Sequence, residues 1–101
     1  MIRVRVRCGP GGAELTAQGH AGYAPAGQDI VCAAVSSVLY TLAGLLDAIG
    51  ELEAFAQGEG STRIAARGER GTKSVARAAE ILQGLAEQWP ECLRVEETAF
   101  E

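Results

Sequence analysis

Apolar and polar residues alternate along five stretches of the chain, and a period of two is typical of β-strands. The alternation is strict over residues 2–8, where every polar position is an arginine. It returns over residues 13–19, after a cluster of glycine and proline that predicts a hairpin turn. Residues 51–57 and 61–67 alternate on either side of a second glycine-rich turn, and residues 93–96 could add a short last strand. We therefore expect two hairpins and one further strand.

Two other stretches repeat their apolar residues at steps of three and four, which is typical of helices. The first begins at Asp29, a good helix cap because its carboxylate accepts backbone N–H groups, and ends at Gly50. The second covers residues 72–89, follows a loop at 68–71 and is stopped by Pro90. The first helix is apolar on more than one side. We expect a sheet to cover one side and a second helix or a second subunit to cover the other.

The order of these elements predicts the fold class. Pairs of strands joined by tight turns and separated by helices favour an α+β domain. The expected order is ββαββαβ, with two helices and a mainly antiparallel sheet. A chain of 101 residues has the size of one domain, so we assign residues 1–101 to a single domain.

The charge balance limits the partners of the protein. Nine basic and thirteen acidic residues give a net charge of -4, the wrong sign for binding a phosphate backbone, so we expect no direct nucleic-acid contact. The row of Arg3, Arg5 and Arg7 has no interleaved aromatic residues and is better explained as a solvated strand face. An acidic surface favours basic partners instead.

The cysteines and one uncharged stretch bear on where the protein works. Cys8, Cys32 and Cys92 form no C-x-x-C pair, and the alternating start of the chain does not resemble a signal peptide. Free thiols without a leader indicate a reducing cytoplasm. Residues 30–46 carry no charge, but the stretch is shorter than a usual membrane span and contains polar residues. We interpret it as a buried core helix and expect no membrane association.

The candidate chemistry centres on His20, the single histidine, which excludes a multi-histidine metal site. A zinc site would need His20 and all three cysteines at no recognised spacing, so we expect no metal and no cofactor. Cys32 follows the proposed cap Asp29 by three residues. A helix N-terminus stabilises a thiolate through its partial positive charge and its free N–H groups. His20 could accept the thiol proton, and open N–H groups beside Cys32 could stabilise an oxyanion.

A purely structural explanation exists for each of these residues. A lone cysteine in a helix is usually a small core residue, and a lone histidine at a strand end is usually a surface group. Capping alone accounts for Asp29. Residues 68–74 lie between a strand and a helix, as a phosphate loop would, but Thr72 separates the last glycine from Lys73. A plain capped turn explains that motif better than an anion site.

A resemblance to the ribosomal-processing cysteine protease family, Prp, rests on two runs of sequence. They are Gly19-His20-Ala21 and, after a glycine-containing loop, Asp29-Ile30-Val31-Cys32-Ala33-Ala34-Val35-Ser36. Members of this family carry a G-H-A element and a helix start based on D-I-V-C-A, with histidine and cysteine twelve residues apart. The order and the spacing match here, and the length and the element order of the chain agree as well.

The resemblance implies a cytoplasmic cysteine endopeptidase that removes the N-terminal extension of a basic large-subunit ribosomal protein. It implies Cys32 as nucleophile, His20 as general base and acid, and Asp29 as the acidic residue near the pair. The loop 21–28 would order over the substrate peptide, and the members of the family are homodimers. Substrate contacts are then expected from Ala21, Gly22, Tyr23, Gly27 and Ser36. The main alternative is a catalytically inactive, ribosome-associated binding module, and a weaker one is an anion-binding domain that uses residues 71–74.

Overall fold

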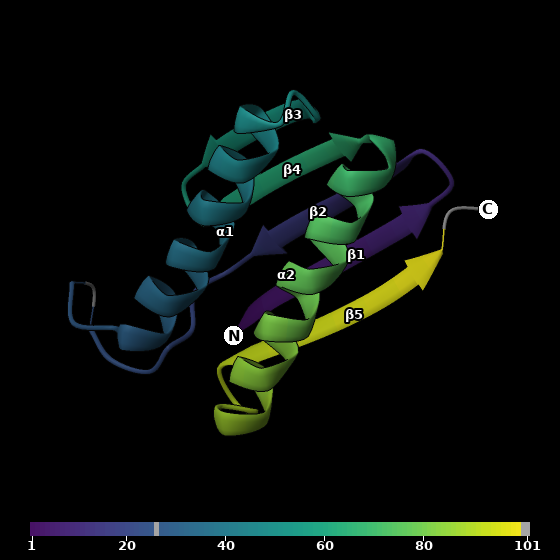
Figure 1. Cartoon of the computed structure of the whole chain (residues 1–101). Helices are drawn as coiled ribbons and strands as arrows, with labels where there is room; N and C mark the ends of the chain where they lie inside the picture. Colours follow the sequence, from purple (N-terminus) through teal and green to yellow (C-terminus); the bar gives the residue numbers. More distant parts are fainter. Residues whose placement is uncertain (26, 100–101) are drawn as a thin grey trace.

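The computed structural model describes residues 1–25 and 27–99, and in them it contains the expected elements in the expected order (Figure 1). The elements are β1 (Ile2–Gly9), β2 (Gly12–Gln18), α1 (Ile30–Ala48), β3 (Leu52–Gly58), β4 (Ser61–Arg67), α2 (Gly68–Gln88) and β5 (Leu93–Ala99). The predicted α+β class with a ββαββαβ order is therefore confirmed. All strands join one sheet in the order β3-β4-β2-β1-β5.

The sheet is antiparallel except at one edge, where β5 pairs with β1 in parallel. This strand runs three residues beyond the predicted range 93–96, through Ala99. The register pairs Leu93 with Ile2 and Ala99 with Cys8, so every residue of β5 has a partner in β1. The sequence underestimates β5 because its last residues are exposed and carry no apolar alternation, and the ladder to β1 is a long-range contact.

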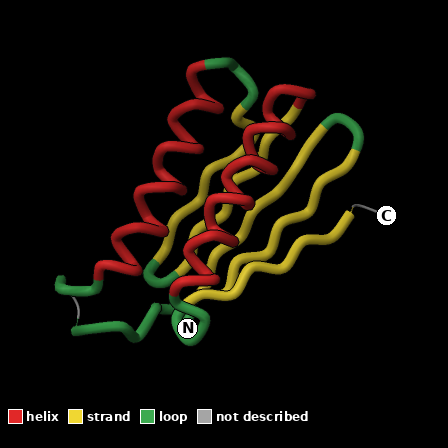
Figure 2. The backbone as a smooth tube through the Cα atoms, turned by 60° about the horizontal axis from the view of Figure 1, so that its bottom comes forward, coloured by secondary structure: helices red, strands yellow, loops and turns green. Residues whose placement is uncertain are grey.

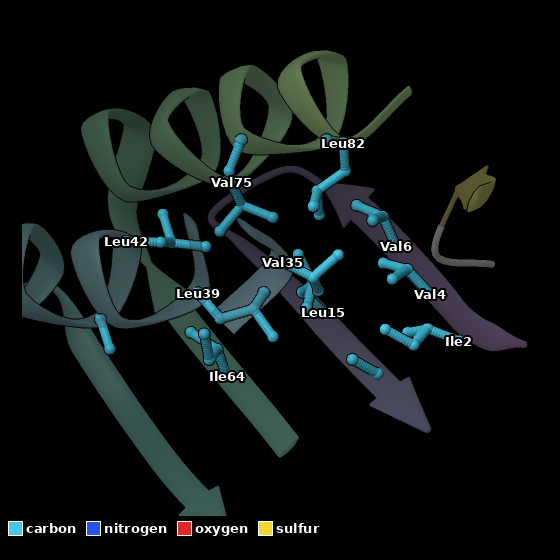
Figure 3. Packing of buried hydrophobic residues seen from close by; sticks show 14 of the residues in the cluster. Ile2, Val4, Val6, Leu15, Val35, Leu39, Leu42, Ile64, Val75 and Leu82 are labelled. Carbon is cyan, nitrogen blue, oxygen red and sulfur yellow. The ribbon is translucent and has the colours of Figure 1, made fainter. Parts of the chain in front are cut away.

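Both helices lie on the same face of the sheet, and the other face is open (Figures 1 and 2). Figure 3 shows side chains of the sheet and of both helices pointing into one core between the two layers. Each buried aliphatic side chain contributes about 1.5–3 kcal/mol to folding through loss of water contact. The largest fully buried side chains are Leu15, Leu46, Ile64, Leu82, Leu93, Val4, Val6, Val31 and Val75.

Helix α1 buries one stripe of its apolar surface and leaves another exposed. Val35, Leu39 and Leu46 are buried in the core, whereas Tyr40 and Leu45 are more than half exposed. The sheet and α2 therefore do not cover every apolar side of the helix, as expected from its composition. Its length and mean hydropathy would also suit a membrane span, as those of many soluble core helices do.

Helix α2 begins earlier than the sequence predicts, because the expected loop at 68–71 is its first turn. Arg67 occupies the cap position, but its side chain makes no capping hydrogen bond to the helix. Instead the carboxylate of Glu51 accepts the N–H of Gly71 at 2.6 Å. A Cβ at Gly68 would lie 2.4 Å from Glu51 Oε2, so glycine leaves the space that this carboxylate fills. The helix N-terminus thus holds an anion that belongs to the chain itself, which argues against the anion-binding alternative.

The open face of the sheet carries the arginine row of β1. Its side chains point away from the helices into solvent, as the alternation predicts. On this face Arg63 donates to Glu14 at 2.8 Å, and Arg5 lies 3.9 Å from Glu96. Ion pairs of this exposed kind contribute about 0–1 kcal/mol each, so the face is a solvated surface with modest internal charge pairing.

Candidate active site

His20 follows the end of β2 and is held in place by the backbone of Gly19. The N–H of Gly19 donates to the carbonyl oxygen of Gly60 at 2.9 Å. Gly19 has a φ of +97°, and a Cβ there would lie 2.4 Å from the carbonyl oxygen of Met1. Only glycine combines this left-handed backbone with such close approach of another chain segment. The imidazole of His20 therefore leaves the sheet from a point fixed by neighbouring backbone on two sides.

Cys32 lies in the first turn of α1, as the position of the cap predicts. Asp29 is the N-cap, and its Oδ1 accepts the N–H groups of Val31 and Cys32, both at 3.0 Å. From the other side, the N–H of Ala21 donates to Cys32 Sγ at 3.3 Å. The sulfur is thus placed at the N-terminal end of the helix with a backbone donor directed at it.

His20 and Cys32 line the same cavity of about 190 Å³. The cavity has an apolar floor that includes Val35 and Leu39, and Ser36, one helical turn after Cys32, is part of its wall. Within residues 1–25 and 27–99, no hydrogen bond joins His20 to Cys32. Catalytic hydrogen bonds are often loose before substrate binds, so a shared cavity is the relevant observation.

The β3–β4 hairpin forms a further wall, which the sequence analysis did not identify. Gln57, Ser61 and Thr62 line the cavity together with the glycines of the turn. The sheet order explains this placement, because β4 lies beside β2 and Gln18 pairs with Ser61. The start of β4 therefore lies next to the end of β2, where His20 follows. The glycine-rich turn at 58–60 was the available signal, but its place beside His20 depends on strand order.

Asp29 organises the loop before the helix as well as the helix itself. Its Oδ2 accepts the N–H groups of Tyr23 at 3.0 Å and Ala24 at 3.4 Å. Hydrogen bonds from backbone N–H groups, with that of Cys32 the strongest, hold the pKa of the Asp29 carboxyl below its usual value. Among the described residues, no hydrogen bond or ion pair links Asp29 to His20. Its contacts are those of a cap that also ties down the loop.

The expectation of open N–H groups beside Cys32 is wrong for the first turn of α1. Asp29 Oδ1 occupies the N–H groups of Val31 and Cys32, and the N–H of Ala33 donates to the Asp29 carbonyl at 3.1 Å. The sequence could not show this, because a capping side chain uses the donors that an oxyanion would need. A backbone N–H that does donate to the sulfur is that of Ala21.

The loop residues predicted to contact substrate lie outside the lining of the cavity in the described part of the chain. The side chain of Ala21 is buried in the core. Gly22 and Gly27 are exposed and have positive φ values. Tyr23 packs edge-on against Trp89, with ring centroids 6.4 Å apart. Figure 2 shows this loop as the long green connection at the end of the molecule where α1 begins.

The remaining cysteines are not among the residues that line the cavity. Cys8 is in β1 and Cys92 precedes β5, and both are partly buried. Burial raises the pKa of the Cys8 thiol, and the nearby carboxylate of Glu97 raises it further. Cys8 is therefore a weak nucleophile near neutral pH.

We expect the pH dependence of folding stability to report the network around Asp29. A carboxylate whose folded pKa is lowered stabilises the fold above its unfolded pKa of about 3.9, and this contribution disappears as pH falls through the folded value. Thermal unfolding of Asp29→Asn should therefore differ most from wild type at neutral pH, and the two curves should converge in acid. Asp47→Asn, near the exposed end of α1, removes the same charge as a control. A difference that stays constant from pH 7 to acid would contradict this role.

Three comparisons with known proteins place this geometry in context. The model of the family described as cysteine protease Prp matches residues 1–94. Two solved structures of the essential ribosomal processing protease Prp from S. aureus are similar to the chain. The structure with a covalently linked product peptide has a TM-score of 0.86 and a sequence identity of 22%. The structure with a substrate peptide has a TM-score of 0.78 and a sequence identity of 20%. Each of these two alignments covers 97% of this chain and 100% of the chain in the solved structure.

A third structure, SMU.848 from Streptococcus mutans, has a TM-score of 0.70 at 24% identity and covers 99% of this chain and 96% of its own. The search of curated proteins found no match. At these identities the solved structures establish the shared fold, and the family match carries the assignment to a class of enzyme.

Proposed function

The chain belongs to the cysteine protease Prp family, and on that premise we propose that Cys32 is its nucleophile and His20 its general base. The observation that carries this proposal is the shared cavity, which His20 reaches from the end of β2 and Cys32 from the start of α1. The other two thiols lie outside its lining among the described residues. A cysteine protease needs one nucleophilic sulfur, and the shared cavity with His20 supports Cys32 for that role.

The proposed reaction follows from the groups around the cavity. His20 accepts the thiol proton of Cys32, and the sulfur attacks the carbonyl carbon of the scissile peptide bond. The C–N bond then breaks as His20 returns the proton to the leaving amine, and a thioester remains. His20 then deprotonates a water molecule that attacks the thioester carbonyl, the C–S bond breaks to release the acid product, and His20 returns the proton to the sulfur. The N–H of Ala21 donates to Cys32 Sγ before the attack, and once that sulfur is bonded to carbon it is the proposed donor to the oxyanion in both steps.

We assign Asp29 a positioning role in this scheme. Its two oxygens bind the N–H groups of Cys32 and of Tyr23, so one carboxylate fixes the nucleophile and the loop together. The proposed substrate contacts then divide into two groups. Ser36 lines the cavity directly. The loop residues, which start at Ala21 next to the sulfur, would contact a peptide that lies across the cavity mouth.

The proposed substrate is a large-subunit ribosomal protein with an N-terminal extension. The S. aureus relatives are ribosomal processing proteases, and one of them holds a substrate peptide. Ribosomal proteins are basic because they bind RNA, and the net charge of -4 on this chain attracts such a substrate. Because ribosomes are assembled in the cytoplasm, we propose that the enzyme acts there.

A homodimer is also part of the proposal. A groove of about 490 Å³ between α1 and α2 exposes a largely apolar surface, to which Leu45 (56% exposed) and Ile81 (47% exposed) contribute. Lys73 and Arg77 border it. Apolar surface of this kind is typical of association sites, and a second copy would cover the exposed stripe of α1. Sedimentation equilibrium measures the dimer directly, and a monomer at high micromolar concentration would contradict it.

We expect the purified protein to shorten the extended ribosomal protein of its own organism. Intact-mass spectrometry before and after incubation should show a loss equal to an N-terminal segment, with cleavage at one bond. Sequencing of the new N-terminus then identifies the bond. A ribosomal protein that binds but keeps its full mass would contradict the proposed reaction and favour a catalytically inactive, ribosome-associated binding module.

A further inference from the structure

The turn of the β3–β4 hairpin lies directly against the imidazole of His20. A Cβ at Gly60 would lie 3.1 Å from His20 Nε2 and 3.6 Å from Cε1. Ordinary contacts between carbon and another heavy atom are about 3.5–4.0 Å. A side chain at this position would therefore require the ring or the turn to shift by a few tenths of an ångström. The contact connects two segments that are forty residues apart in sequence and adjacent in space because β4 pairs with β2.

Gly60 meets three requirements at the same time. Its φ of +67° is one that L residues rarely adopt, so the turn needs glycine for its backbone. Its carbonyl oxygen accepts the N–H of Gly19 at 2.9 Å, which fixes the residue before His20. Its missing side chain avoids a tight contact with the imidazole. The first requirement is common to many turns, whereas the other two act on His20.

We propose that Gly60 is a positioning residue for the general base, holding the strand end before His20 through its carbonyl and keeping the surface beside the ring free of a side chain. This inference rests on the proposed role of His20. Proton transfer depends on the position of the base within a few tenths of an ångström, and a misplacement of about 1 Å can cost about 10²-fold in rate. Substrate affinity depends on it far less. The loss on perturbing Gly60 should therefore fall on kcat and leave KM nearly unchanged.

The chain offers a matched control for the backbone requirement alone. Gly11, in the β1–β2 turn, has a φ of +82°, and a Cβ built there has nothing within 4 Å. Alanine at position 11 meets the same left-handed strain as alanine at position 60, without a ring beside it.

The experiment compares Gly60→Ala with Gly11→Ala on the N-terminal peptide that mass spectrometry identifies as cleaved. Both variants should lose similar thermal stability. Gly60→Ala should lower kcat by about 10-fold to 100-fold, with KM within about twofold, whereas Gly11→Ala should keep both constants. Equal kcat values for the two variants would overturn the inference. If Gly60→Ala does not fold, Gly60→Asn and Gly11→Asn replace the pair, because asparagine tolerates positive φ better than alanine.

A spectroscopic measurement separates this inference from the proposed function. His20 is the single histidine, so its imidazole C2 proton gives one resolvable NMR signal in each variant. The signal should move in Gly60→Ala, with an Overhauser contact to the new methyl group, and stay in place in Gly11→Ala. An unmoved signal would contradict the packing of Gly60 on His20. This NMR measurement does not depend on catalysis, so it tests the packing of Gly60 on His20 even if the protein cleaves no peptide.

Discussion

Cys32→Ala is expected to lower kcat/KM for the cleaved peptide by at least about 10⁴-fold, because no other group in the cavity can form the thioester. The effect on folding should be small. The side chain is partly buried, and the substitution removes one sulfur and the weak hydrogen bond from Ala21. We expect a stability loss of about 1 kcal/mol or less, which thermal unfolding would measure. The variant should therefore be folded and able to bind peptide.

The other cysteines provide matched controls for that result. Cys8→Ala and Cys92→Ala remove thiols of similar burial that lie outside the cavity lining, and both variants should cleave at the wild-type rate. In wild type, iodoacetamide should modify Cys32 before Cys8, whose pKa is raised by burial. Full activity in Cys32→Ala would contradict the assignment of Cys32 as the nucleophile. Loss of activity in Cys8→Ala, with Cys32→Ala still active, would assign that role to Cys8.

The second large effect is expected for His20→Ala. General base catalysis contributes about 10²–10⁴-fold, so kcat should fall by about 10³-fold. The pH–rate profile should also lose the limb that reports protonation of the base. Because His20 is exposed, the free energy of unfolding should change by less than about 0.5 kcal/mol. Steady-state kinetics from pH 5 to pH 9 with thermal unfolding measures both quantities.

Added imidazole sharpens this test. The substitution enlarges the cavity beside Cys32, so a free imidazole of the same chemistry has room to replace the lost ring. Partial recovery of kcat with rising imidazole, absent in Cys32→Ala, would identify His20 as the group that moves the proton. His20→Ala with an unchanged pH profile would instead assign the base to another residue.

The sequence predicted the parts of this protein that depend on local patterns. The strict alternation of residues 2–8 and the cap at Asp29 placed β1 and α1 within a residue or two of their observed bounds. The start of α2 was predicted too late, because its N-terminus is capped by Glu51, which is twenty residues from Gly71 in sequence. No local rule describes a cap supplied from such a distance.

The same division applies to the site. His20, Cys32 and Ser36 could be selected from the motif, since their residue types and spacing are readable without a fold, and they line one cavity. The wall made by Gln57, Gly60 and Thr62 could not be predicted from the sequence, because it depends on the pairing of β4 with β2 in the sheet. The free donors expected in the first turn of α1 were assigned without allowing for the cap. Long-range pairing and competition for hydrogen bonds account for what the sequence missed.

The edge-to-face contact of Tyr23 with Trp89 gives the protein a built-in optical reporter. Trp89 is the single tryptophan of the chain, and it sits at the C-terminal end of α2 against the segment proposed to cover the peptide. Indole emission responds to the polarity and the aromatic neighbours around the ring. A displacement of Tyr23 when a peptide binds would change that emission, so association could be timed in a stopped-flow instrument without attaching a dye.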